Sequence, residues 1–323
     1  MKIANGVLEL IGSTPMVRLT KVTEGIDSEV CAKLEYLNPS GSIKDRMALR
    51  MIEDAEKSGR LRPGMKIVEA STGNTATSLA MVGAVKGFSV AVYVPSSAAS
   101  EERSRIITSF GAEVISVEID DPDNEFLKSK GIHGAIAEVI PRQVCLAEER
   151  LNPDRIWWAR QFSNPANVAA HRETTGKEIL EQTDGKVDAF VTALGTGGTL
   201  TGVAQSLRAH NPGVRIVAVE PKQSRTIKDG KLKIPIIDGV SGGIMLELSQ
   251  KKIADEVIAV DEDDAIGMAH KLAEEEGLFC GLSSGGNVFA AIQVARTLGP
   301  GKRVVTLLVD HRDRYLFRER WTT

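Results

Sequence analysis

The strongest constraint on the fold is a regular alternation between short apolar segments and longer segments with helical patterning. The apolar, β-rich runs lie at 65–71, 89–95, 112–118, 156–162, 187–194, 215–221, 256–262 and 303–310. The helical segments lie at 74–87, 100–110, 165–182, 198–210, 263–277 and 286–298. Strands this apolar are typical of parallel sheets that helices cover on both faces. The alternation therefore predicts an α/β fold with right-handed crossovers between parallel strands.

The apolar runs fall into two groups of four, the first ending at residue 162 and the second beginning at residue 187. Two such groups predict two sheets, and hence two lobes with a cleft between them. The length of 323 residues agrees with two domains, since a domain has about 150 residues.

Composition and charge argue against several classes of protein. The 40 Lys and Arg residues nearly balance the 43 Asp and Glu residues, whereas a nucleic-acid-binding protein needs a basic stripe. No apolar run approaches the roughly 18 residues of a membrane span, and the N-terminal segment lacks the apolar stretch of a signal peptide. The cysteines Cys31, Cys145 and Cys280 lie far apart, which disfavours a disulfide framework or a metal site. We expect a cytoplasmic protein without a metal, a nucleic-acid partner or a membrane anchor.

Three polar, glycine-rich segments lie where a ligand site is expected, at residues 71–75, 195–202 and 281–287. In open α/β sheets, ligands bind beyond the carboxyl ends of strands, where loops lead into helix N-termini. Backbone N–H groups and hydroxyls at such positions form a ready anion site. Each segment alone also fits a helix cap with a tight turn, but three in one chain favour ligand binding.

The segment at 195–202 favours a phosphate ester as its ligand. It lacks the lysine of a Walker loop, and Leu200 stands where the GxGxxG fingerprint requires its third glycine. Glu220, at the end of the next predicted strand, leaves a nicotinamide-dependent enzyme open as a minor alternative. Thr196 and Thr199 flank the glycines and are suited to donate to a bare phosphate.

Lys44 lies at the predicted start of a helix, directly after the chain-breaking segment 38–42. A cation is disfavoured at a helix N-terminus, which lowers the pKa of the amine and frees it to act as a nucleophile or base. The alternative is a surface cluster in which Asp45 offsets Lys44 and Arg46. A nucleophilic lysine, a phosphate loop and a cleft lined by Ser and Asn together suggest pyridoxal phosphate held as a Schiff base.

The sequence resembles the cysteine synthases (O-acetylserine sulfhydrylases), a fold-type II pyridoxal-phosphate-dependent family, over nearly the whole chain. The motifs NPSGSIKDR, STGNT, QFSNPAN, GTGGTLTG and GLSSG occur in the order of that family. The resemblance implies a tryptophan synthase β-like fold, with two lobes that each hold a mostly parallel sheet and an active-site cleft between them. The large cofactor-binding domain is expected to comprise residues 1–46 plus 160–323, and the small mobile substrate domain residues 47–159.

The resemblance implies a role for each motif residue. Lys44 is expected to hold the cofactor and to act as the catalytic base, Asn74 to contact the cofactor's 3′-oxygen, and Ser283 to face its pyridine nitrogen. The expected phosphate-binding residues are Gly195, Thr196, Gly197, Gly198 and Thr199. The expected substrate-binding residues are Ser71, Thr72, Gly73, Asn74, Thr75, Gln161 and Gly239.

The resemblance also implies the reaction. An O-activated serine, O-acetylserine above all, is expected to lose its β-substituent and give an aminoacrylate, to which sulfide adds to form L-cysteine. Lys44 would remove the α-proton and later return it. A homodimer is implied, and a serine acetyltransferase is a possible partner by the same resemblance.

Departures from the family pattern keep related activities open. The carboxylate loop reads STGNT instead of TSGNT, and the loop that contains Gly239 reads GVSGGIM instead of a GIGAGF type. The alternatives are a cystathionine β-synthase or an O-phosphoserine sulfhydrylase, and less so a threonine synthase or a serine dehydratase. A regulatory protein that only binds the cofactor is a further, minor alternative.

Several other residues have a structural interpretation. We expect His171, in the helix after QFSNPAN, to be structural, and Trp157 and Trp158 to pack in a core. Asp310 is expected near the pyridine ring, and His311 is a weaker candidate for a proton relay.

Overall fold

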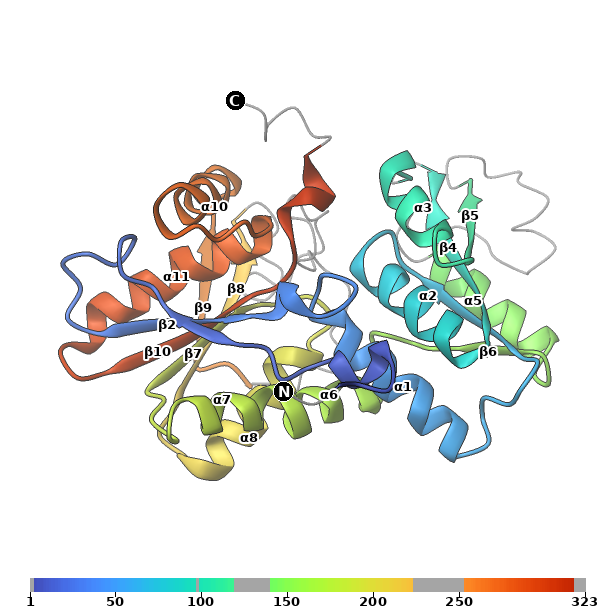
Figure 1. Ribbon diagram of the computed structural model, residues 1–323, viewed down its shortest axis with the longest axis horizontal. Coiled ribbons are helices and arrows are strands. Elements are labelled where there is room, and N and C mark those ends of the chain that lie inside the picture. The colour runs from blue at the N-terminus through green and yellow to red at the C-terminus, as the bar shows by residue number, and fades with distance from the viewer. Residues whose placement is uncertain (1–2, 97–98, 119–139, 223–252, 317–323) are drawn as a thin grey trace. The chain divides into compact units, whose positions relative to one another are not determined.

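The computed structural model describes residues 3–96, 99–118, 140–222 and 253–316 (Figure 1). By its internal contacts the chain divides into two compact units, residues 1–47 with 165–323 and residues 48–164. The first boundary falls inside helix α1 (Lys44–Lys57). The predicted division of roles between a cofactor-binding and a substrate-binding domain stays a prediction, and so does the cleft between them.

The larger unit is built on a six-stranded sheet in the order β1-β2-β10-β7-β8-β9. Strands β1 and β2 pair antiparallel, and the other neighbours pair parallel. The strands are β1 (Met16–Arg18), β2 (Glu29–Leu34), β7 (Ala189–Ala193), β8 (Arg215–Pro221), β9 (Glu256–Val260) and β10 (Arg303–Leu308). The last four were predicted from the sequence. The first two were not, because β1 is short and Glu29 and Lys33 interrupt the apolar pattern of β2.

Helices cover both faces of this sheet (Figure 1). The covering helices are α7 (Gly176–Gln182) and α8 (Gly198–His210) on one face, and α10 (Glu262–Glu276) and α11 (Leu282–Leu298) on the other. Successive side chains of β10 lie on opposite faces of the sheet. Val304 packs in the core with α10 and α11, and Val305 packs in the core with α7 and α8. Burial on both faces explains why the strands are nearly all apolar. Short helices complete the unit: η1 (Val7–Leu10), η2 (Glu35–Leu37), α6 (Pro165–Ala170), η4 (His171–Thr175) and η5 (Arg312–Tyr315).

The smaller unit holds a four-stranded parallel sheet in the order β5-β4-β3-β6. Its strands are β3 (Lys66–Ala70), β4 (Ser89–Pro95), β5 (Glu113–Val117) and β6 (Ile156–Trp158). Its described helices, besides most of α1, are α2 (Asn74–Lys86), α3 (Glu101–Thr108) and α5 (Ile140–Leu151). Val144 of α5 packs into an apolar core with Val68 and Trp158. On α2, a Cβ at Gly83 would overlap the Val90 side chain, so this helix lies directly against the sheet. The predicted α/β class with two sheets is confirmed.

Some of the predicted elements differ from those in the structure. The segment 281–287 was expected to be a loop, but α11 already begins at Leu282. Gly281 is its N-cap and is the one residue of the segment that lies outside the helix. A Cβ at Gly285 would overlap the carbonyl oxygen of Ala265, so this glycine serves close packing of α11 on α10, not a turn. The helix expected at 165–182 is interrupted by the π-helical turn η4.

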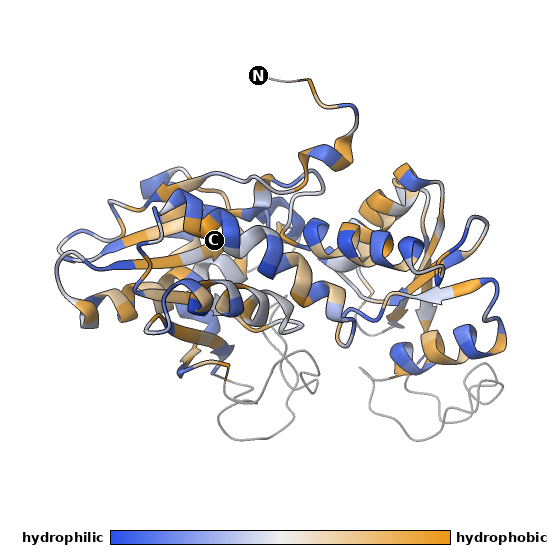
Figure 2. Cartoon of the chain, turned by 90° about the horizontal axis from the view of Figure 1, so that it is seen from below, coloured by the Kyte–Doolittle hydropathy of each residue, from blue (hydrophilic) through white to orange (hydrophobic). Residues whose placement is uncertain are grey.

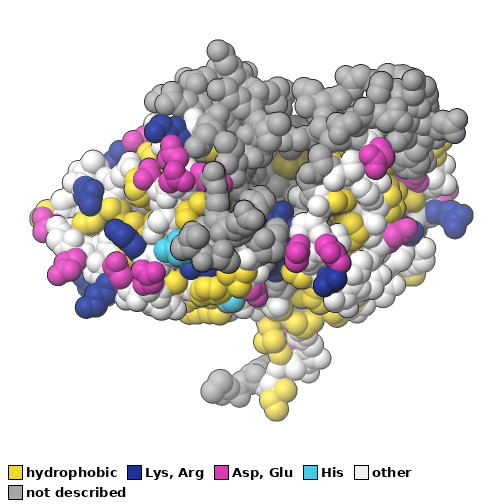
Figure 3. Space-filling model, turned by 90° about the horizontal axis from the view of Figure 1, so that it is seen from above, with side chains coloured by type: hydrophobic (Ala, Val, Ile, Leu, Met, Phe, Trp, Pro, Cys, Tyr) yellow, Lys and Arg dark blue, Asp and Glu magenta, His cyan; other side chains and the backbone are white. Residues whose placement is uncertain are grey.

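The surface of the described residues is mixed in character. Along the helices, hydrophobic and hydrophilic residues alternate, as expected for helices with one buried face (Figure 2). Acidic and basic side chains are interspersed on the face seen in Figure 3. Among the described residues, no helix is both long enough and apolar enough to cross a membrane.

Candidate active site

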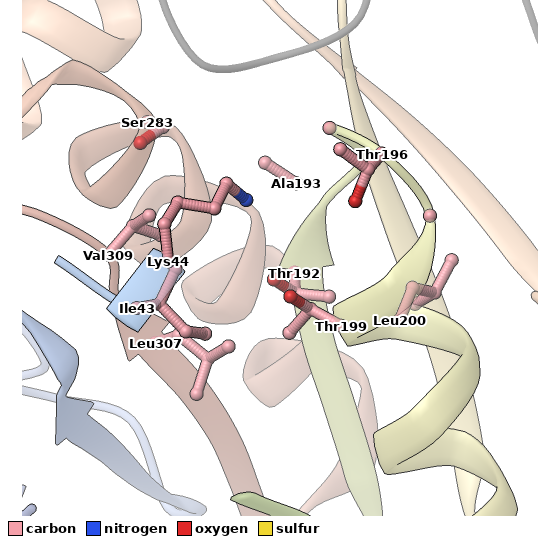
Figure 4. A pocket seen from close by; sticks show the side chains of 12 residues that line it. Ile43, Lys44, Thr192, Ala193, Thr196, Thr199, Leu200, Ser283, Leu307 and Val309 are labelled. Carbon is pink, nitrogen blue, oxygen red and sulfur yellow. The ribbon is translucent and has the colours of Figure 1, made fainter. Parts of the chain in front are cut away.

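Lys44 is the first residue of α1 and belongs to the larger unit. The backbone just before it is tied to the end of β10, since the Ile43 N–H donates to the Val309 carbonyl at 2.9 Å and Ser42 forms a bridge with Asp310. The Lys44 amine points into a pocket, with Ser283 on one side and Thr196 on the other (Figure 4). The predicted helix start at this lysine is therefore confirmed.

The pocket lies wholly within the larger unit and encloses about 380 Å³, part of it open to solvent. It is formed by the ends of β7 and β10 and by the N-terminal ends of α1, α8 and α11. The lining residues are Ile43, Lys44, Thr192, Ala193, Gly195, Thr196, Gly197, Thr199, Leu200, Ser283, Leu307 and Val309. Parallel strands and helix N-termini thus converge on one site, lined by both polar and apolar residues, as predicted for an open α/β sheet.

The pKa of Lys44 is lowered from 10.5 to about 8. Burial of the amine is the main cause, because the protein replaces the water that would stabilise the ammonium. The carboxylate of Asp310 acts in the opposite direction and limits the fall. The predicted direction of the shift is confirmed, but its main cause is burial and not the helix N-terminus. An amine with this pKa is partly neutral near pH 7 and can act as a base.

The segment from Gly195 to Thr199 joins the end of β7 to the start of α8. Gly197 caps the helix at φ 87°, a left-handed conformation that favours glycine. The first N–H groups of a helix have no acceptor within it, so they can bind an anion at this end. A Cβ at Gly198 would overlap Oδ1 of Asn167, which holds the Thr196 hydroxyl through Nδ2 at 2.9 Å. The predicted phosphate loop thus has the shape and the donors of an anion site.

His171 contacts this loop, although the sequence analysis gave it only a structural role. Its Nε2 lies 3.2 Å from Thr199 Oγ1, and its Nδ1 lies 2.9 Å from Thr175 Oγ1. Burial, with the nearby charges of Lys44 and Arg46, holds the pKa of His171 well below its usual value, so the ring is neutral. A neutral imidazole has one donor and one acceptor, one for each of these threonines. Polar residues four positions apart, at 167, 171 and 175, were the signal in the sequence.

Ser283 is the second residue of α11 and is almost completely buried. Its Oγ has no hydrogen-bond partner among the described residues. Burying a hydroxyl without a hydrogen-bond partner costs free energy of folding. Such a hydroxyl in a pocket therefore indicates a ligand that forms the missing hydrogen bond. The neighbouring Ser284 differs, because its Oγ accepts a bond from the Val309 N–H at 2.8 Å.

The predicted carboxylate loop, Ser71 to Thr75, lies in the smaller unit between β3 and α2. Asn74 begins α2 and Gly73 is its N-cap. The structure brings Thr75 and Gln161 together, since Thr75 Oγ1 donates to Gln161 Oε1 at 2.7 Å. The loop lies between a strand end and a helix N-terminus, as predicted. The strand predicted over 156–162 is too long, because β6 ends at Trp158 and Gln161 lies in the turn that follows.

The remaining predictions have different outcomes. Gly239 lies outside the described residues. The alternative of a surface Lys-Asp-Arg cluster is wrong, because Asp45 and Arg46 are almost fully buried. Asp310 is buried near Lys44, and its Oδ2 accepts a bond from the Tyr315 hydroxyl.

Comparison with known proteins agrees with this geometry. Residues 7–310 match the family described as pyridoxal-phosphate dependent enzyme. The chain belongs to this family. A cysteine synthase of Staphylococcus aureus is 40% identical over 316 residues, which are 98% of this chain and 96% of that protein. The cofactor of this enzyme is therefore pyridoxal phosphate, and the nicotinamide alternative is set aside.

Solved structures of the family have the same fold. A cysteine synthase (OASS) of Entamoeba histolytica superposes with a TM-score of 0.89 at 37% identity, covering 100% of this chain and 92% of that chain. An O-ureido-L-serine synthase superposes with a TM-score of 0.87 at 36% identity, covering 99% and 96%. The predicted fold type II, and the resemblance on which it rested, are confirmed.

The described residues fit this cofactor. Its phosphate needs a cup of N–H and hydroxyl donors, which the Gly195–Thr199 segment offers. Its aldehyde needs an amine that is neutral near physiological pH, and Lys44 lines the same pocket. Its ring nitrogen offers a partner for the orphan Oγ of Ser283.

Proposed function

We propose that this enzyme makes L-cysteine by β-replacement, from an O-activated serine and sulfide, with O-acetylserine as the preferred substrate. The observation that carries the proposal is the Lys44 amine, which faces the phosphate loop and the Ser283 hydroxyl within one pocket; that hydroxyl has no partner in the part of the chain that the structure describes (Figure 4). The names of the relatives support the same reaction, since the chain is 40% identical to a cysteine synthase over nearly its whole length.

Four groups of residues would carry the steps. The Gly195–Thr199 segment holds the phosphate, Ser283 meets the pyridine nitrogen, and Asn74 contacts the 3′-oxygen. Pyridoxal phosphate, when bound, supplies an electron-withdrawing ring that makes the α-proton of an attached amino acid acidic and lets its β-substituent leave. Lys44, with a pKa of about 8, accepts the α-proton and later returns it. A neutral serine at the ring nitrogen does not force protonation there, which suits β-replacement more than transamination.

The smaller unit would bind the substrate carboxylate. The N–H groups at the start of α2, that of Thr75 included, suit an anion at a helix N-terminus, together with the hydroxyls of Ser71 and Thr72. Gln161 supports that loop through Thr75. Gly239 remains a proposed substrate contact on the resemblance alone.

We also propose a cytoplasmic homodimer, with a serine acetyltransferase as a possible partner. The location is supported by Cys31, Cys145 and Cys280, which are free and buried in the structure. The oligomeric state and the partner are supported only by the family.

A substrate assay on the purified enzyme with pyridoxal phosphate tests the proposal. The enzyme is given sulfide with O-acetylserine, O-phosphoserine or serine, and cysteine formation is measured. We expect the highest kcat/KM with O-acetylserine, a visible band that changes on its addition and returns with sulfide, and no turnover by Lys44→Ala. Cysteine formation only from O-phosphoserine would mean that the leaving group is phosphate and not acetate.

Other products would change the proposal further. Cystathionine from serine and homocysteine, threonine from homoserine phosphate, or pyruvate from serine would each redirect it to the corresponding alternative. Hydroxyurea is tested as a further nucleophile, because one structural relative is an O-ureido-L-serine synthase. Efficient formation of that product in place of cysteine would overturn the choice of sulfide.

A further inference from the structure

Glu69 is a buried carboxylate to which the sequence analysis gave no role. It lies in β3, one residue before the strand ends, and is fully buried. Three N–H groups donate to it. The Ala70 N–H at 2.8 Å and Trp158 Nε1 at 3.0 Å bind Oε1, and the Gln161 N–H at 2.8 Å binds Oε2. Burial raises the pKa of Glu69, while these N–H donors and Arg142 act against the rise.

Gln161 continues this network toward the carboxylate loop. Its backbone is held by Glu69, its Nε2 donates to the Ala70 carbonyl at 2.9 Å, and its Oε1 accepts the Thr75 hydroxyl at 2.7 Å. Ala70 and Thr75 are the residues on either side of Ser71–Asn74. The Gln161 side chain therefore spans the base of this loop, and Glu69 fixes the position from which it does so.

We propose that Glu69 is a positioning residue for substrate binding, which sets the shape of the Ser71–Asn74 loop through Gln161. The inference rests on the proposed function, because it takes this loop as the site of the substrate carboxylate. Two of the three bonds to Glu69 come from the backbone N–H groups of Ala70 and Gln161. Ala70 directly precedes the loop, and the Gln161 side chain bonds to the residues on both sides of it. A bond to a charged acceptor in a buried site is stronger than a neutral one, so its loss moves the residues that it holds.

Glu69→Gln tests this role with almost no change of shape. The amide can accept with one end only, so its NH2 group must face an N–H donor of Ala70 or Gln161. Glu149→Gln is the matched control. Glu149 lies in the same unit and accepts from the Trp158 backbone N–H at 3.0 Å and from Arg160 at 2.9 Å, but bonds to neither Ala70 nor Gln161.

The readout is the equilibrium binding of L-serine and of L-serinamide to the holoenzyme, followed by the visible absorption of the cofactor. Both ligands carry the amine, but only serine carries the carboxylate. We expect Glu69→Gln to weaken serine binding about tenfold or more and to leave serinamide within about twofold. Glu149→Gln should keep the serine-to-serinamide ratio of the wild type. Should Glu69→Gln fail to fold, Glu69→Asp keeps the charge but withdraws it from the Gln161 N–H, and the same loss is expected.

The outcomes separate this inference from the proposed function. If the wild-type holoenzyme binds serine and serinamide equally, the carboxylate loop is misassigned, and both the substrate-binding proposal and this inference fail. If the wild type prefers serine and Glu69→Gln keeps the full preference, only the inference is overturned. Equal weakening of both ligands would also overturn it, since a general loss of structure has that effect.

Discussion

Arg46 binds Glu178 through two N–H···O bonds, Nη1 to Oε1 at 2.6 Å and Nη2 to Oε2 at 2.8 Å. The same guanidinium binds Glu35 through Nε and Nη2, and the Lys33 ammonium lies 2.8 Å from Glu178. Arg46 stands two residues after Lys44 in α1. The buried cluster of Lys33, Glu35, Arg46 and Glu178 therefore fixes the helix turn that carries the proposed catalytic lysine.

This cluster predicts a pH-dependent contribution to stability. Arg46 and Lys33 overcome the effect of burial and lower the pKa of Glu178 from 4.5 to about 2. A lowered carboxyl pKa stabilises the fold fully above the unfolded value and loses its effect as the pH falls through the folded value. The stabilising effect of the Glu178 carboxylate is therefore lost between about pH 4.5 and about pH 2. Above this range it contributes roughly 3 kcal/mol to the free energy of unfolding.

Glu178→Gln should lower the free energy of unfolding by roughly 3 kcal/mol at pH 7, and by much less near pH 2.5. Urea unfolding of the cofactor-free protein at both pH values measures this. Glu181→Gln is the control, because Glu181 lies exposed in the same helix, and little change is expected at either pH. A loss for Glu178→Gln that is equal at both pH values would contradict the linkage.

Lys44 should be the most reactive lysine of the cofactor-free protein near neutral pH. Because its pKa is about 8, half of its amine is neutral at pH 8 and a smaller but reactive fraction at pH 7. Pulse acylation followed by peptide mass spectrometry should give a midpoint near pH 8 for Lys44. Exposed lysines such as Lys302 serve as internal references for the extent of acylation. Asp310→Asn should lower the Lys44 midpoint further, because Asp310 stabilises the ammonium; an unchanged midpoint would remove Asp310 from this role.

The position of Lys44 was predictable from the sequence, but the cause of its shifted pKa was not. Chain breakers followed by a helical pattern located the start of α1. Burial depends on strand β10 and helix α11, which lie more than 200 residues away in the chain. Local patterns carry no information about such contacts. The buried state of Arg46 was missed for a similar reason, since its partners Glu35 and Glu178 belong to other elements, η2 and α7.

The sheets were predicted well where strands are buried on both faces, as in β7, β8 and β10. Strand β2 was missed because it carries Lys33, whose ammonium is bound by Glu178, Gln182 and the Thr14 carbonyl. Because burying an unpaired charge is costly, a charged residue in a sequence predicts an exposed position unless its partners are known.

Ser283 and Ser284 should respond in opposite ways to truncation. Ser283→Ala removes a buried hydroxyl that has no partner among the described residues, so it should leave the cofactor-free protein equally stable or slightly more stable. Ser284→Ala removes the acceptor of the Val309 N–H and should lower the free energy of unfolding by about 1–2 kcal/mol. Urea unfolding compares the two variants. We also expect Ser283→Ala to weaken pyridoxal phosphate binding, measured by titration of its visible band. Equal losses of stability in both variants would mean that Ser283 has a protein partner.

Gly285 and Gly286 make a second matched pair, within α11. A Cβ at Gly285 would overlap the backbone carbonyl oxygen of Ala265 and come within 2.9 Å of Ala269, so the two helices must separate. At Gly286 the nearest atoms are the Ala265 Cβ at 3.6 Å and a Val260 methyl at 3.9 Å, which is ordinary contact. Gly285→Ala should therefore lower the free energy of unfolding by about 1–3 kcal/mol, despite the better helix propensity of alanine. Gly286→Ala should raise it by about 0.5–1 kcal/mol, because alanine restricts the unfolded chain and clashes with nothing. Thermal and urea unfolding test both variants, and a gain for Gly285→Ala would mean that α10 and α11 do not pack through this glycine.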